Sequence, residues 1–134
     1  QALRQELYAV AAKFAPDIRC VVGISTEEIE AWILGDRKAI AEAYPSCNME
    51  VLDSYEQDSV CGTWEVLCRA ISDNAEELIE IGYPAAGHYK ALWADTISRH
   101  MLPQNNVSPS FNTFKMALIT ALKHPGPIYR RRTF

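Results

Sequence analysis

The chain has 134 residues, of which 49% are hydrophobic and 22% charged, and its formal net charge is −4. This length suits one domain, and no apolar run approaches the roughly 20 residues of a membrane-spanning helix, so we expect a soluble protein without a membrane partner. The acidic balance argues against binding of nucleic acid by general electrostatics, because that requires clustered Lys and Arg.

The first part of the chain predicts a helix, a strand and a second helix. Residues 3–14 carry apolar side chains at helical spacing, and Pro16 ends this pattern. Residues 18–24 are apolar and β-branched without alternation, which is typical of a strand covered on both faces of a mainly parallel sheet. Ser25-Thr26-Glu27-Glu28 matches a capping box, so a helix is expected from about Thr26.

The remainder predicts mostly helices. Asp36 can cap a helix over residues 37–44, and the polar stretch 46–62 predicts a loop. Helical periodicity between Gly, Pro and Ser breaks then predicts helices over residues 63–71, 75–81, 85–101 and 111–122, the last capped by Ser110. A single strand is too little for a complete α/β domain, and the first residues already look like the inside of a helix. We therefore expect a segment upstream of Gln1.

The residues that commonly hold zinc lack the spacing of a zinc site. The four cysteines include no C-x-x-C pair and the three histidines no H-x-x-x-H pair. With no signal peptide, we expect reduced thiols in a cytoplasmic protein. The Arg130 to Arg132 run is expected to be solvated.

Three motifs resemble one bacterial family. Glu28-Ile29-Glu30-Ala31-Trp32-Ile33-Leu34-Gly35-Asp36 closely resembles the E-x-E-x-W-x-x-x-D core of the family catalogued as domain of unknown function 4276. Tyr89-Lys90 and Ser108-Pro109-Ser110-Phe111-Asn112-Thr113-Phe114 follow in the family's order. Together the motifs span most of the chain.

The resemblance implies an α/β fold of TOPRIM type, in which a small parallel sheet presents acidic residues that bind Mg²⁺. An N-terminal glutamate and an Asp-x-Asp pair of that site are absent from this chain. The resemblance therefore assigns residues 1–124 to the C-terminal part of a single TOPRIM-like domain, mostly helical here, and leaves 125–134 as a flexible tail. The isolated fragment is expected to be inactive.

Glu28 and Glu30 are the candidate metal ligands. They follow a predicted strand, at the edge of the sheet where parallel α/β proteins bind ligands, and Mg²⁺ prefers carboxylates. Side chains two residues apart point about 200° apart on a regular helix, so one ligand is expected rather than two. The alternative is that Glu28 completes the capping box while Glu27 and Glu30 form a solvated acidic face.

Lys90 and Glu28 are the candidate catalytic residues. Trp93 and Ile97 place Lys90 on a helix side that also carries apolar residues, where a lysine needs a carboxylate or phosphate partner. In the functional reading Lys90 holds a substrate phosphate or the transition-state charge. In the alternative its methylenes pack on Trp93 and its ammonium reaches water.

The other motif residues have structural interpretations. Trp32 is expected to pack in the core with Ile29 and Ile33, and Asp36 to cap a helix. Ser108 and Ser110 are expected to end a loop and cap the last helix.

Two functions remain open. One is part of a Mg²⁺-dependent nuclease or other phosphoryl-transfer enzyme, used in phage defence or DNA maintenance, with nucleic acid bound by the full-length protein. The other is a non-catalytic interaction module, for which the resemblance implies an ATPase subunit as partner. An upstream Glu and Asp-x-Asp would favour the first.

Overall fold

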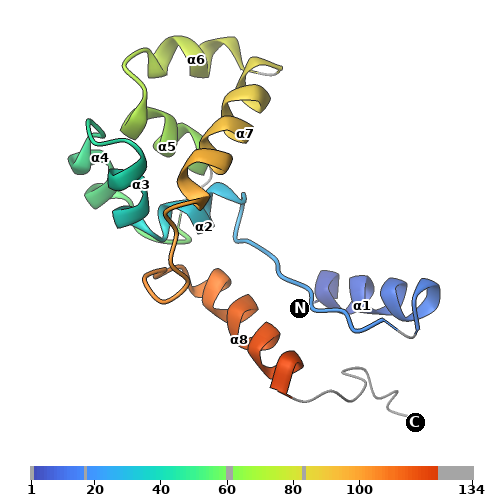
Figure 1. The fold of residues 1–134 in the computed structure, drawn as a ribbon. Helices are drawn as coiled ribbons and strands as arrows, with labels where there is room; N and C mark the ends of the chain where they lie inside the picture. Colours follow the sequence, from blue (N-terminus) through green and yellow to red (C-terminus); the bar gives the residue numbers. More distant parts are fainter. Residues whose placement is uncertain (1, 17, 60–61, 83, 124–134) are drawn as a thin grey trace.

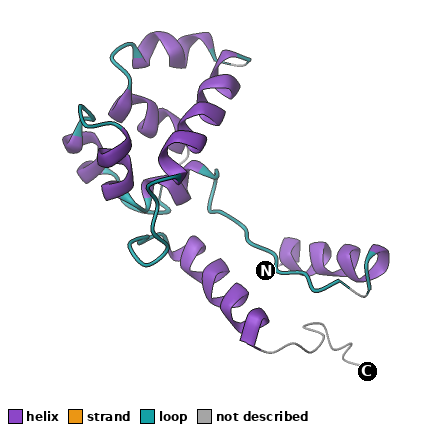
Figure 2. Ribbon diagram, in the orientation of Figure 1, coloured by secondary structure: helices purple, strands orange, loops and turns teal. Residues whose placement is uncertain are grey.

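The computed structural model describes residues 2–16, 18–59, 62–82 and 84–123, which form a helical structure (Figure 1). Figure 2 shows helices and loops but no strand in this part of the chain. The helices are α1 (Ala2–Phe14), α2 (Glu30–Leu34), α3 (Arg37–Ala43), α4 (Met49–Ser54), α5 (Thr63–Ile71), α6 (Ala75–Ile81), α7 (Ala85–Ser98) and α8 (Pro109–Lys123).

The expected α/β fold with a TOPRIM-like parallel sheet is wrong for the described residues. Residues 18–24, predicted as a strand, form an irregular segment between α1 and α2 (Figure 1). Among the described residues, no backbone-to-backbone hydrogen bond involves residues 19–24. A strand needs a neighbouring strand to pair its N–H and C=O groups, and a β-branched sequence does not supply one.

The second predicted helix starts four residues later than the capping box indicated. Glu27 has φ of 72°, a left-handed conformation that interrupts a helix, and α2 begins only at Glu30. Asp36 caps α3 as predicted, because its carboxylate accepts a hydrogen bond from Ala39 N at 3.2 Å. The predicted helices 63–71 and 75–81 match α5 and α6 at both ends, while α7 ends three residues before the predicted limit.

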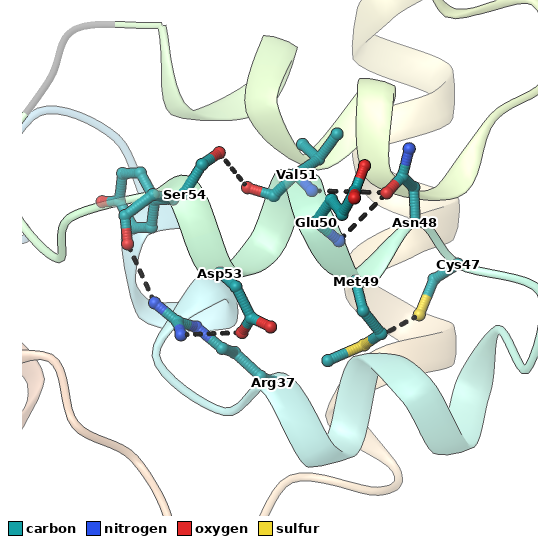
Figure 3. A network of polar contacts seen from close by, with 9 residues as sticks. Arg37, Cys47, Asn48, Met49, Glu50, Val51, Asp53 and Ser54 are labelled. Carbon is teal, nitrogen blue, oxygen red and sulfur yellow. Dashed lines mark hydrogen bonds and ion pairs between the residues drawn. The ribbon is translucent and has the colours of Figure 1, made fainter.

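The predicted loop 46–62 contains an additional helix, α4. Asn48 caps it, with its side-chain oxygen accepting from the backbone N–H of Glu50 and Val51 (Figure 3). Arg37 of α3 lies against the other end, 3.2 Å from Asp53 Oδ1, and also donates to Tyr55 O at 2.8 Å. The helix is only six residues long, so these flanking contacts rather than helix propensity hold it in place.

Helices α2 to α7 share one hydrophobic core. In this body α5 packs against α2, α4 and α6, and α7 packs against α2, α3 and α6. The largest apolar side chains that are completely buried come from five different helices: Leu34, Ile40, Leu52, Leu67 and Ile97. Their burial removes apolar surface from water and is the main force holding these short helices together.

Helices α1 and α8 lie outside this body (Figure 1). No residue of α1 is buried, and α8 buries Ala121 alone among its described residues. Trp32 joins α8 to α2, since its ring stacks on Phe114 at 5.3 Å and meets Phe111 edge-on at 5.5 Å. The expected grouping of Trp32 with Ile29 is therefore wrong, and Ile29 is exposed.

The predicted tail, residues 125–134, lies outside the described residues. Within the described part, no helix is both long and apolar enough to cross a membrane.

Candidate functional site

The three predicted site residues meet in one ion cluster. Lys90 Nζ lies 3.2 Å from Glu28 Oε1 and 3.3 Å from Glu30 Oε1. Lys90 comes from α7, Glu30 is the first residue of α2, and Glu28 lies in the turn before it. Residues 62 positions apart in the sequence thus form a cation held between two carboxylates.

Both glutamates reach the same cation because they do not share a regular helix. The expectation that residues 28 and 30 would diverge assumed a helix from Thr26 onward, and this premise is wrong. Glu27 has a left-handed conformation, and Glu28 follows it in a tight turn in which its carbonyl oxygen accepts from Ala31 N at 3.2 Å. From this position Glu28 Oε1 reaches Lys90, as Glu30 Oε1 does.

Glu28 binds the start of α5 instead of its own helix. Its Oε2 accepts hydrogen bonds from Thr63 Oγ1 and Trp64 N, each at 3.1 Å. Gly62 precedes α5 and has no side chain to cap it, so Glu28 takes the place of a cap. Burial opposes the charged form of Glu28, but the hydrogen bonds from Trp64, Lys90 and Thr63 outweigh it and lower the pKa of Glu28.

Glu30 is the most buried member of the cluster. Its side chain is 3% exposed, and its Oε2 has no hydrogen-bond partner among the described residues. The expected solvated face of Glu27 and Glu30 is therefore wrong. A buried carboxylate oxygen without a donor is costly, so this atom marks a place where the protein would gain by binding a cation or a proton donor.

Lys90 is paired rather than directed to water. Its side chain is 18% exposed, and its ammonium also lies 6.0 Å from the centroid of the Trp64 ring. Burial opposes the charge, but the contacts with Glu28 and Glu30 raise the pKa of Lys90. The alternative in which the ammonium simply reaches solvent is wrong, and the predicted carboxylate partner is present.

The donor atoms suit Mg²⁺ as a partial ligand set. Proteins hold this ion through one or two carboxylates, with water or phosphate oxygens completing the octahedron. Lys90 lies against Oε1 of both carboxylates, so Glu30 Oε2 is the oxygen left without a partner. No group of three or more His, Cys, Asp or Glu side chains within the described ranges could hold a metal alone. The other oxygen ligands of a Mg²⁺ ion at Glu30 would therefore have to come from water or from a substrate phosphate.

A second polar cluster, which the sequence did not reveal, surrounds Asp58. This residue has φ of 58°, and its carboxylate accepts from Ser110 N at 2.9 Å and Ser108 Oγ at 3.0 Å. Gln57 Nε2 donates to it at 3.1 Å. Burial opposes its charge, but these hydrogen bonds together lower the pKa of Asp58.

The hydroxyl groups of Ser108 and Ser110 each have one proton to donate, which fixes the direction of the hydrogen bonds in this cluster. Ser108 Oγ must donate to Asp58, because a charged carboxylate only accepts. Ser110 Oγ, 3.1 Å from Ser108 Oγ, is therefore the donor of that pair and accepts from Trp32 Nε1 at 2.8 Å. Ser108 also caps α8 by accepting from Phe111 N, so Ser108 and not Ser110 fulfils the predicted capping role.

A third contact ties the end of α2 to the loop before α8. Asn106 Nδ2 donates to Trp32 O at 2.7 Å, and Asn106 Oδ1 accepts from Ser108 N at 3.0 Å. Gly35 packs directly on this amide, so that a Cβ there would approach Asn106 Oδ1 to 2.2 Å. The predicted cap Asp36 adds a hydrogen bond from Leu102 N at 2.9 Å.

Among the described residues, Lys90 is the cation paired with Glu28 and Glu30, and the other predicted candidates make different contacts or are outside this part of the chain. His100 Nδ1 lies 3.6 Å from Glu42 Oε2 on the surface. His124 and the Arg130 to Arg132 run are outside the described residues.

Comparisons with protein-family models, curated proteins and solved structures found no match.

Proposed function

We propose that Glu28, Glu30 and Lys90 form part of a site for phosphoryl transfer on a phosphate ester, as in a Mg²⁺-dependent nuclease. The observation that supports this most is the Lys90 ammonium between two carboxylates, at 3.2 and 3.3 Å, beside an unpaired oxygen of buried Glu30. Phosphoryl transfer depends mainly on fixed charges placed around the phosphate, and this cluster offers both signs at one point.

Each residue has a distinct role in this proposal. Lys90 binds a non-bridging phosphate oxygen and offsets the charge that develops in the transition state. Glu30, through its unpaired Oε2, would hold Mg²⁺ with Glu28 beside it, and the bound ion would supply Lewis-acid polarisation of the phosphate. Thr63 and Trp64 keep the Glu28 carboxylate in position, so it needs little reorganisation when substrate arrives.

The first test is calorimetric titration of the protein with Mn²⁺ and Mg²⁺. We expect saturable binding that is lost in Glu30→Gln and kept in Glu42→Gln, a surface carboxylate paired with Lys38. The proposal also predicts phosphodiester cleavage that is lost in Lys90→Met and retained in Lys38→Met. Identical titrations of wild type and Glu30→Gln would refute the metal role. A place in phage defence or DNA maintenance is part of the same proposal.

A second function is supported by the exposed side of α1. Leu3, Leu7, Val10 and Phe14 are 55%, 41%, 54% and 75% exposed, and their spacing of four, three and four residues places them on one face. Such an apolar stripe is typical of a helix that packs against a partner, and an ATPase subunit is the partner we propose.

This alternative can be separated from the first by co-elution. A partner ATPase encoded beside the gene should co-elute with the wild type on size exclusion and separate from Leu7→Glu/Val10→Glu. Glu6→Gln/Lys13→Gln is the matched control on the same helix. Co-elution unchanged by Leu7→Glu/Val10→Glu would remove α1 as the contact surface.

A further inference from the structure

An open cavity of about 580 Å³ lies between the start of α1 and the N-terminal end of α8. Its polar lining comes from Arg4, Ser25, Thr26, Asp58, Ser110 and Thr113. Glu28, Glu30 and Lys90 are not among the residues that line it. The cavity is therefore a second place where a polar ligand could bind.

Arg4 brings a positive charge that no acidic side chain of the described residues offsets by an ion pair. Arg4 Nε is buried yet has no hydrogen-bond partner. A guanidinium with a desolvated, unused N–H is suited to an oxyanion, which it can bind with two parallel hydrogen bonds.

Asp58 lines the same cavity, but its charge is offset. Ser110 N, Ser108 Oγ and Gln57 Nε2 all donate to its carboxylate, and Ser110 lies in the first turn of the 15-residue helix α8. The positive end of a helix stabilises an anion at this place. Asp58 thus occupies the anion position at the end of α8, which leaves Arg4 as the uncompensated charge.

Two hydroxyl groups add hydrogen-bond donors beside Arg4. Ser25 and Thr26 both line the cavity, and their hydroxyl groups make no hydrogen bond to the other described residues. Ile24 and Pro109 complete the wall with apolar surface. The lining therefore combines one cation, two free hydroxyls and an apolar side.

We propose that this cavity binds a phosphodiester group, with Arg4 on the non-bridging oxygens and the Ser25 and Thr26 hydroxyls donating to them. The Asp58 carboxylate is already held by three donors and Arg4 supplies a single positive charge, so a group with one negative charge is favoured over a phosphate monoester with two. The apolar wall suits the sugar next to the phosphate. The cavity is lined by none of Glu28, Glu30 and Lys90. The choice of a phosphodiester as its ligand rests on the proposed function.

The test is an NMR titration with the dinucleotide TpT, which carries one diester and no terminal phosphate. The indole N–H of Trp32, bonded to Ser110 Oγ, and the amide of Thr26, 3.4 Å from the same oxygen, are reporters at the site. We expect both signals to shift saturably with TpT and less with inorganic phosphate. Arg4→Gln should weaken binding at least about tenfold, as expected for loss of a charge-assisted pair.

Two control variants separate the outcomes. Arg99→Gln removes an exposed arginine paired with Asp95 and should bind TpT like the wild type. Lys90→Met should also keep the Trp32 and Thr26 shifts, so a failure of the phosphoryl-transfer site would not be confused with a failure here. Shifts that do not saturate, or that survive unchanged in Arg4→Gln, would overturn the inference.

Discussion

Lys90 Nζ lies 3.3 Å from Glu30 Oε1, and the Glu30 side chain is only 3% exposed. The pair couples α7 to α2 through a charge that water barely reaches. Removing the ammonium leaves a buried carboxylate without its cation, which typically costs 3–5 kcal/mol when the pair is well buried. We expect Lys90→Met to lower the free energy of unfolding by about 3 kcal/mol, measured by urea denaturation.

Lys38→Met is the matched control for this variant. Lys38 forms a surface pair with Glu42, and its side chain is 70% exposed, so its loss should change stability by less than about 0.5 kcal/mol. Lys90→Met/Glu30→Gln should recover part of the stability lost in Lys90→Met, because the buried charge is gone. Equal free energies of unfolding for Lys38→Met and Lys90→Met would show that the Lys90–Glu30 pair does not stabilise the fold.

Acid should destabilise the protein through Glu28 and Asp58. Both have folded-state pKa values below their ordinary values of 4.5 and 3.8. A depressed pKa contributes stability above the ordinary value, and this contribution is lost as the pH falls through the folded-state value. We expect the free energy of unfolding to fall from about pH 4.5 downward, as measured by urea denaturation at pH 6 to pH 2.

Glu28→Gln/Asp58→Asn should be less stable at neutral pH and should show a shallower acid dependence. The control is Glu80→Gln/Asp73→Asn, which changes the same number and types of carboxylates at exposed positions that form no ion pair with the described residues. If the free energy of unfolding depends on pH in both double variants as it does in the wild type, groups other than Glu28 and Asp58 cause the acid unfolding.

Asp58→Ala should loosen the attachment of α8. The change removes the acceptor of Ser110 N and of Ser108 Oγ, leaving polar groups that are largely shielded from water. We expect a loss of about 2 kcal/mol, the usual range for losing a helix-end acceptor with its hydrogen bonds. Denaturation followed by Trp fluorescence can measure this, and Asp95→Ala, in an exposed pair with Arg99, is the control. A loss no larger than that of Asp95→Ala would rule out this role of Asp58.

Gly35→Ala should destabilise the protein through a steric conflict with Asn106. The added Cβ would lie 2.2 Å from Asn106 Oδ1, closer than any real contact. In an Asn106→Ala background the conflict is absent, so the same change at Gly35 should cost much less. A double-mutant cycle by urea denaturation measures the difference. Additive effects of the two substitutions would argue against the contact.

Local sequence patterns predicted the bounds of several helices correctly, but the strand that they predicted is absent from the described residues. The helices α5 and α6 were predicted at both ends, because Gly62, Ser72 and Gly82 break the periodic pattern beside them. Residues 18–24 were predicted as a strand from their apolar β-branched composition, which cannot show whether another strand lies alongside. The additional helix α4 was missed because its polar sequence has a weak periodic pattern.

Glu28, Glu30 and Lys90 lie together in the structure, but the sequence did not indicate the contacts of Glu28 with the start of α5. A match to a capping box assigned Glu28 to its own helix, whereas its real partners are 35, 36 and 62 residues further along the chain. Asp58 was missed because it lies in a polar stretch where a lone aspartate carries no spacing signal. Contacts over such separations depend on how the helices pack, and a local pattern contains no information on this.

The contacts that attach α8 also have a consequence for the order of folding. Asn106 binds Trp32 across 74 positions, and Leu102 binds Asp36 across 66, while most contacts among α2 to α6 join neighbouring helices. Bringing together such distant positions costs chain entropy before any bond is gained. We therefore expect α8 to attach after its neighbours have folded, so that stacking of Trp32 on Phe114 is among the last events of refolding.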